Sequence, residues 1–197
     1  PGSRRPRLHR PAPANAAMQA DVPSVACVLI LDADGQRICC KYSKGHFPTL
    51  AEQHAFEKKV FEKSSRTNAK SEAEIVVFDN LVTVYKNSSD AWFFVVSKQN
   101  ENELILASVL SALCDALALS LRSLDKRAML DSYDTVLLTI DELVDGGMIL
   151  ETDAASIASR VGMKAAQSEP VATSDSSSSL SAAFSSAKES LARSLLR

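Results

Sequence analysis

The sequence of 197 residues lacks the local motifs that phosphate-binding and nucleophilic enzymes commonly carry. It holds only six glycines, and they form no P-loop or dinucleotide-binding loop. There is no GxSxG turn, and the residues around the three histidines suggest no Cys/His/Asp set. We therefore expect this chain not to be an enzyme, and we predict no catalytic, cofactor-binding or metal-binding residue.

The four cysteines lack the spacing of a redox or metal site. Cys39 and Cys40 are adjacent, whereas a thioredoxin-type site needs CxxC and a zinc site needs two such pairs of ligands. Neighbouring side chains of a strand point to opposite faces, so a disulfide between these two would distort the strand. We expect reduced thiols, with Cys40 in the core and Cys39 on the opposite face.

Clustered positive charge is missing outside the first residues. Residues 1–17 carry four arginines and no acid, so residues 18–197 hold 18 basic and 24 acidic side chains. Binding to nucleic acid depends on clustered Lys and Arg that neutralise phosphates, so this balance argues against a nucleic-acid partner. The first residues also lack the apolar region of a signal peptide. We expect residues 1–21 to be a disordered arm or a remnant of cloning, with Met18 as the native start.

Five apolar segments have the pattern of β-strands. They are Val25–Leu31, Gln36–Tyr42, Ala73–Phe78, Leu81–Lys86 and Ala91–Lys98. The last is apolar through its middle, which is typical of a central strand. Between the first two, Asp side chains that bond backbone amides and a positive φ at Gly35 predict a tight turn. A calcium-binding loop from Asp32 is excluded, because its sixth and twelfth positions would be Arg37 and Ser43.

Helical spacing of apolar residues begins at Thr49 and returns after Asn102. Thr49 and Glu52 have the spacing of a capping box, and Leu50, Phe56 and Val60 recur at near-helical intervals. The later segment carries a stripe of Leu106, Leu110, Leu113, Leu117, Leu121 and Leu124. Residues 104–121 hold a single charge, so a membrane span is the alternative to a core helix. At about 27 Å this stretch is short for a span, and its amphipathic stripe favours a core helix.

Two further helices are predicted before a serine-rich region. One covers Arg127–Asp145 and ends at Gly146. Its inward residues are Met129, Tyr133, Val136, Leu137, Ile140 and Val144. Asp141, Glu142 and Asp145 near its end form either a solvated face or a partner contact. A short helix is capped by Thr152-Asp153 and ends near Gly162.

The C-terminal region consists of a predicted linker and a predicted amphipathic helix. Residues 164–179 are rich in Ser and poor in core-forming residues. In residues 180–197, one helical face carries Leu180, Phe184, Leu191 and Leu195, which we predict to be the partner-binding residues. A helix on such a linker buries its apolar face only by docking, either onto a protein or onto a membrane with lipid-packing defects.

Several segments together resemble the small adaptin-type subunits, and most closely the coatomer zeta subunits. The segments are ILDADGQRICCKY, AFEKKVFEKS, EAEIVVFDNLVTVYK, ENELILASVL, DELVDGGMILETD and the terminal SAKESLARSLLR. The resemblance covers roughly residues 22–162 and 180–197. It implies an α+β, longin-like (SNARE-like) domain over residues 22–163, with a five-stranded antiparallel sheet. One helix is expected on one face of the sheet and two on the other.

The resemblance also implies a structural role without catalysis or cofactor. Zeta subunits pair with the trunk of the gamma subunit, alongside the other subunits of the COPI coat, coatomer. An Arf-family GTPase recruits that coat from the cytoplasm to the cytosolic face of Golgi membranes, for Golgi-to-ER and intra-Golgi vesicle transport. The alternative is a sigma-type small subunit of a clathrin adaptor, which contributes to a pocket for dileucine cargo signals. We match none of that pocket's residues to this sequence, so cargo binding stays open.

Overall fold

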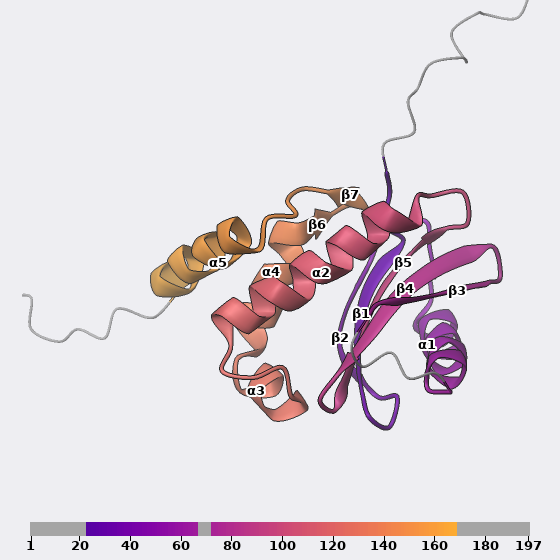
Figure 1. Ribbon diagram of the computed structural model, residues 1–197, viewed down its shortest axis with the longest axis horizontal. Coiled ribbons are helices and arrows are strands. Elements are labelled where there is room, and N and C mark those ends of the chain that lie inside the picture. The colour runs from indigo at the N-terminus through magenta and orange to yellow at the C-terminus, as the bar shows by residue number, and fades with distance from the viewer. Residues whose placement is uncertain (1–22, 67–71, 169–197) are drawn as a thin grey trace, which may run out of the picture. The chain divides into compact units, whose positions relative to one another are not determined.

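The computed structural model describes residues 23–66 and 72–168, which include one antiparallel five-stranded sheet (Figure 1). The strands are β1 Cys27–Asp32, β2 Arg37–Tyr42, β3 Glu74–Phe78, β4 Leu81–Ser88 and β5 Ala91–Lys98. Their order is β2-β1-β5-β4-β3, so β5 is central, as its continuous apolar sequence predicts. Contacts divide the chain into residues 1–162 and 163–197, and the whole sheet belongs to the first unit.

A bulge in β2 reverses the predicted faces of the adjacent cysteines. Arg37 and Cys39 pair with consecutive residues of β1, so Ile38 between them is the extra residue. Ile38 and Cys39 consequently pack in the same core cluster, while Cys40 is partly buried against the cluster on the other face. The prediction that Cys40 is the core cysteine is wrong, because the bulge interrupts the two-residue alternation on which it was based.

Helix α1, Leu50–Ser64, covers one face of the sheet (Figure 1). The hydroxyl of Thr49 accepts a hydrogen bond from the backbone N–H of Glu52 at 3.2 Å, which is the predicted N-cap. Phe56 and Val60 are buried against aromatic and aliphatic side chains of the sheet. Leu50 is exposed, because the six-residue step from it to Phe56 is about 1.7 helical turns and places it away from the buried face.

The opposite face is covered by α2, Glu103–Ser120, and by the helices that follow it. The mean hydropathy of 1.8 over 18 residues would suit a membrane span by length and composition. Eight of its side chains, however, are buried within the domain. They are Leu106, Val109, Leu110, Ala112, Leu113, Cys114, Ala116 and Leu117. This burial agrees with the prediction of a core helix.

The helix predicted over residues 127–145 is interrupted. The structure has α3, Lys126–Asp131, and α4, Tyr133–Leu143, separated by Ser132 with φ −126° and ψ 45°. Met129, Val136 and Ile140 are buried as predicted, but Tyr133 and Leu137 are exposed. The break rotates the second segment relative to a continuous helix, so one apolar stripe does not describe both.

The chain leaves α4 as a short hairpin of β6, Val144–Asp145, and β7, Met148–Ile149. Gly146 has a positive φ of 56°, but it lies in the turn of this hairpin and does not end the helix as predicted. The hairpin is tied to the segment just before β1, because the backbone N–H of Val25 donates to the carbonyl of Gly147 at 2.8 Å.

Helix α5, Ala154–Ser168, is longer than predicted. The Asp153 carboxylate accepts from the backbone N–H of Ser156 at 2.8 Å, which confirms the predicted cap. Ile157 and Val161 are buried in the cluster that includes α2 and α4. The helix continues through Gly162, because that glycine keeps a helical backbone. Residues 169–197, with the predicted partner-binding positions, lie outside the described residues.

Candidate functional site

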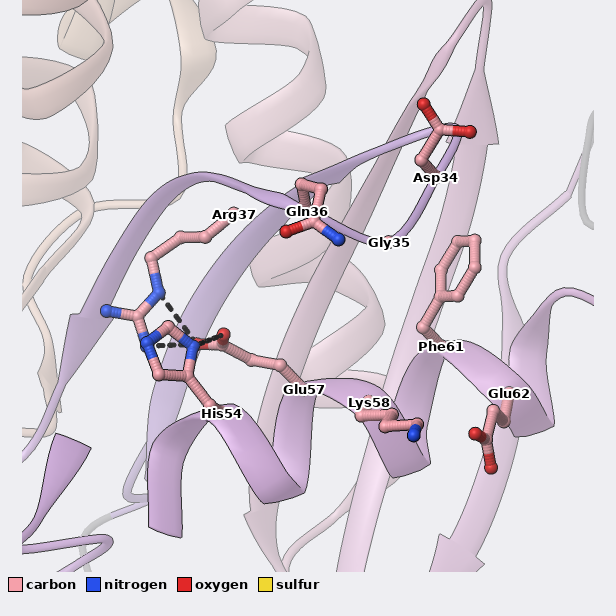
Figure 2. Close-up of a pocket in the computed structure, with 9 residues that line it drawn as sticks. All are labelled: Asp34, Gly35, Gln36, Arg37, His54, Glu57, Lys58, Phe61 and Glu62. Carbon is pink, nitrogen blue, oxygen red and sulfur yellow. Dashed lines mark hydrogen bonds and ion pairs between the residues drawn. The ribbon is translucent and has the colours of Figure 1, made fainter. Parts of the chain in front are cut away.

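A cavity of about 840 Å³ lies between α1 and the β1–β2 turn (Figure 2). It is lined by Asp34, Gly35, Gln36, Arg37, His54, Glu57, Lys58, Phe61 and Glu62. The sequence element ILDADGQRICCKY supplies one wall and α1 supplies the other. Because its lining is rich in ionisable side chains, this cavity is a candidate for a catalytic or ligand-binding site.

Glu57 is the buried charge of this cavity, with 4% of its side chain exposed. Arg37 donates to Glu57 Oε1 from Nε at 2.8 Å and also from Nη2, and the Tyr42 hydroxyl donates to the same oxygen at 2.8 Å. His54 Nδ1 lies 3.2 Å from Oε2, as Figure 2 shows for the Arg37–Glu57–His54 group. Burial and the nearby Cys27 and Glu57 raise the pKa of Tyr42, so its hydroxyl stays a donor.

The turn that forms the other wall is held by the predicted Asp chemistry. Asp32 Oδ1 accepts from the backbone N–H groups of Asp34 at 3.0 Å and Gln36 at 2.7 Å. Gly35 has the predicted positive φ of 76°, and an added Cβ there would lie 2.6 Å from the ring of Phe61. The close approach of Gly35 and Phe61 in Figure 2 shows why the turn packs directly against α1.

These contacts make the cavity a fixed joint between β2 and α1. The Glu57 carboxylate accepts from Arg37 and Tyr42 and faces His54, so its hydrogen-bonding capacity is largely used within the domain. Among residues 23–66 and 72–168, no three His, Cys, Asp or Glu side chains are grouped as metal ligands. The described chemistry therefore supports a structural role for this charge network.

The sequence predictions missed Glu57 as a buried residue. It follows the buried Phe56 directly and precedes the buried Val60 by three residues, so its position lies within the apolar face of α1. A buried carboxylate needs a cationic partner. Arg37, on a predicted strand, is that partner and is the signal in the sequence that could have indicated the burial of Glu57. His54 is on the exposed side of the helix.

A second feature is an exposed apolar surface at the start of α2 and at the end of the β6–β7 hairpin. Leu104 is 78% exposed, Met148 is 56% exposed and Leu150 is 54% exposed. We call these three residues the α2–β7 patch. Large apolar side chains that gather on a surface mark contacts with other molecules more often than scattered ones do.

The acidic run Asp141, Glu142 and Asp145 leads into this patch, since Asp145 pairs with Met148 across the hairpin, and the run is partly neutralised within the domain. Lys41 Nζ contacts Asp141 at 2.6 Å and Asp145 at 3.6 Å. Arg160 contacts Glu142 at 3.1 Å and Glu151 at 3.0 Å. The first of these pairs connects β2 to α4, so the run contributes to packing and also faces solvent.

Known proteins with similar sequences identify the family of this domain. The family model for the clathrin adaptor complex small chain matches residues 24–168. Coatomer subunit zeta-1 of Arabidopsis thaliana is 46% identical over 176 residues, which are 89% of this chain and 98% of that protein. The chain belongs to the coatomer zeta subunits. Coatomer subunit zeta-1 of Homo sapiens is similar to this zeta-family chain at 39% identity over 181 residues, or 91% and 97% of the two chains.

A structural comparison gives the same fold for this zeta-family chain. A chain of a homology model of the full-length AP-3 complex aligns with a TM-score of 0.59 and 21% identity, covering 73% of this chain and 96% of that one. The longin-like fold and the family predicted from the sequence are therefore confirmed. The sigma-type alternative is not favoured, since the zeta relatives match at 39% to 47% identity over nearly their whole length.

Proposed function

We propose that this chain is a non-catalytic structural subunit of the COPI coat that pairs with the trunk of the coatomer gamma subunit. The observation that carries the proposal is its identity of 46% with a coatomer zeta subunit over 98% of that protein. The charge network around Glu57 supports it, because the network joins two elements of the domain and leaves little of the carboxylate free for reaction.

The proposal includes a place in the cell. The chain would be cytoplasmic and peripheral on the cytosolic face of Golgi membranes, to which an Arf-family GTPase recruits the assembled coat. Its work would be in Golgi-to-ER and intra-Golgi vesicle transport. The support is that the relatives in plants and mammals carry the name coatomer subunit.

Co-expression with a gamma-type trunk tests the pairing. At high concentration we expect the chain alone to be poorly soluble or oligomeric, and to become monodisperse with the trunk at a ratio of one to one. The trunk of a clathrin-adaptor large chain is the matched control and should not rescue it. A stable monomer without affinity for the gamma-type trunk would refute the proposal, and rescue by the clathrin-adaptor trunk alone would support a sigma-type subunit.

We also propose that residues 180–197 form an amphipathic helix, connected by a linker, that docks on a coat partner through Leu180, Phe184, Leu191 and Leu195. The support is the spacing of these residues in the sequence. Replacing all four by Ser in the full chain should weaken binding to the assembled coat. Flotation of the full chain with small and large liposomes gives the other outcome, in which size-dependent flotation that the Ser variant loses would indicate membrane binding.

A further inference from the structure

We infer that the α2–β7 patch, together with the acidic residues around it, is the surface on which the large coat partner docks an apolar segment flanked by Lys or Arg. This inference rests on the proposed function, because the partner is the one named there. It adds the surface on this chain and the chemistry of the segment that binds it.

The patch is assembled from segments far apart in the sequence. Ser24 forms a β-bridge with Met148, and its N–H and hydroxyl donate to Glu101 Oε1 at 3.3 Å and 2.9 Å. Glu101 precedes Leu104 by three residues, so one serine connects β7 to the start of α2. Figure 1 agrees, since the β6–β7 hairpin is drawn beside the first turns of α2.

The backbone under the patch is fixed. The Leu150 N–H donates to the Leu143 carbonyl at 2.9 Å, and Ile149 between the two exposed residues packs against the core. The Leu104 N–H donates to the side chain of Asn102 at 2.9 Å, which caps α2. The three apolar side chains are thus presented by ordered backbone, and a partner that covers them has little ordering entropy to overcome here.

The segments that carry the patch are acidic, and we call their acidic residues the rim. Residues 101–103 and 141–153 hold seven acidic residues and no basic one. They are Glu101, Glu103, Asp141, Glu142, Asp145, Glu151 and Asp153. Lys41 and Arg160 each pair with two of them, which leaves this surface with a net negative charge. The acidic run, which the sequence left open between a solvated face and a partner contact, acquires a function in this setting.

The negative charge around the patch determines which kind of partner can bind there. A second copy of this chain would bring an equally acidic surface to the contact, and an anionic lipid surface would be repelled in the same way. A segment with apolar anchors and basic flanks satisfies both the exposed side chains and the rim. A stable interface buries about 800 Å² on each partner, which is more than three side chains provide. The three patch residues are therefore the centre of a larger interface.

The decisive experiment replaces the patch in the full-length chain and titrates it with purified gamma-type trunk. The double variant Leu104→Ser/Leu150→Ser should bind about 30-fold more weakly, as loss of central apolar anchors commonly does. The matched control is Leu50→Ser/Leu119→Ser, because these leucines are 59% and 64% exposed on other parts of the surface. The control should bind within about twofold of the unchanged chain.

A second variant keeps the apolar side chains. Glu103→Lys reverses one charge of the rim and should weaken binding several-fold at low salt and less at high salt, as screening predicts. If the unchanged chain binds the trunk and both patch variants bind within twofold of it, the inference is overturned and the proposed function stands. If the unchanged chain does not bind the trunk, the proposed function fails and the inference falls with it.

Discussion

The buried carboxylate of Glu57 joins α1 to β2 through its ion pair with Arg37. The substitution Glu57→Gln removes the negative charge but keeps the length of the side chain and one acceptor oxygen. Arg37 then loses the counter-charge that its Nε contacts at 2.8 Å, while Tyr42 keeps a neutral acceptor. The variant therefore tests the charge of the joint more than its shape.

The expected loss of unfolding free energy is about 2–3 kcal/mol. Removing one partner of a fully buried ion pair costs about 3–5 kcal/mol. The Arg37 side chain is 23% exposed, so water can solvate part of the released guanidinium and the loss should fall below that range. A double-mutant cycle with Arg37→Gln should give a coupling of about 1–2 kcal/mol, since the two groups are in direct contact.

Urea unfolding followed by tryptophan fluorescence is a suitable assay. Trp92 is the single tryptophan, and its ring lies 6.0 Å from that of Phe61 on α1, so its emission reports on the packing of this face. Glu62→Gln on the same helix is the matched control, because Glu62 is exposed. A loss for Glu57→Gln no larger than that of the control, or a coupling below about 0.5 kcal/mol, would refute the joint.

Three further predictions test the turn, the acid sensitivity and the thiols. Gly35→Ala should destabilise more than Gly45→Ala, although both glycines have positive φ, because a Cβ at Gly35 would lie 2.6 Å from an aromatic ring and nothing lies within 4 Å at Gly45; equal losses in urea unfolding would contradict this. Asp32→Asn should flatten the fall of stability in acid: burial raises the pKa of Asp32, but hydrogen bonds from a lysine and two backbone amides outweigh it and hold that pKa below its usual value. The stabilisation is thus present above about pH 4 and lost as the pH falls through the lowered pKa, which urea titrations between about pH 6 and pH 3 would reveal. Burial raises the pKa of Cys39 to about 11 and that of Cys40 above its usual value, so a thiol reagent at neutral pH should label the folded chain slowly; fast labelling of Cys39 would contradict its buried position.

The five strands were predictable because each apolar segment is bounded by polar turn residues, whereas their full order comes only from the structure. The continuous apolar run around Phe93 places β5 in the centre, and the cap at Thr49 places the start of α1. The faces of Cys39 and Cys40 were not predictable, since a bulge changes the alternation and leaves no mark in the composition of β2. The break in the helix at Ser132 was not predictable either, because apolar residues continue at helical spacing on both sides of it in the sequence.

The site was less predictable than the fold because it depends on contacts between distant residues. Glu57 lies twenty positions from Arg37, and its burial depends on β2 packing beside α1. The α2–β7 patch needs Ser24, Glu101 and Met148 to meet, and no local pattern expresses that meeting. Periodicity reports which face of an element is buried, but it does not report which exposed faces adjoin.

The positions of Glu57 and of the α2–β7 patch separate two kinds of failure that a coat subunit can show. Glu57 is buried between α1 and β2, so its loss should lower stability and leave the affinity of the folded fraction unchanged. Leu104 and Leu150 are mostly exposed, so their loss should lower affinity and leave stability nearly unchanged. A variant that changed both quantities in proportion would show that the domain folds only with its partner. Measuring unfolding and trunk binding on the same set of variants therefore decides whether assembly uses a preformed surface or completes the fold.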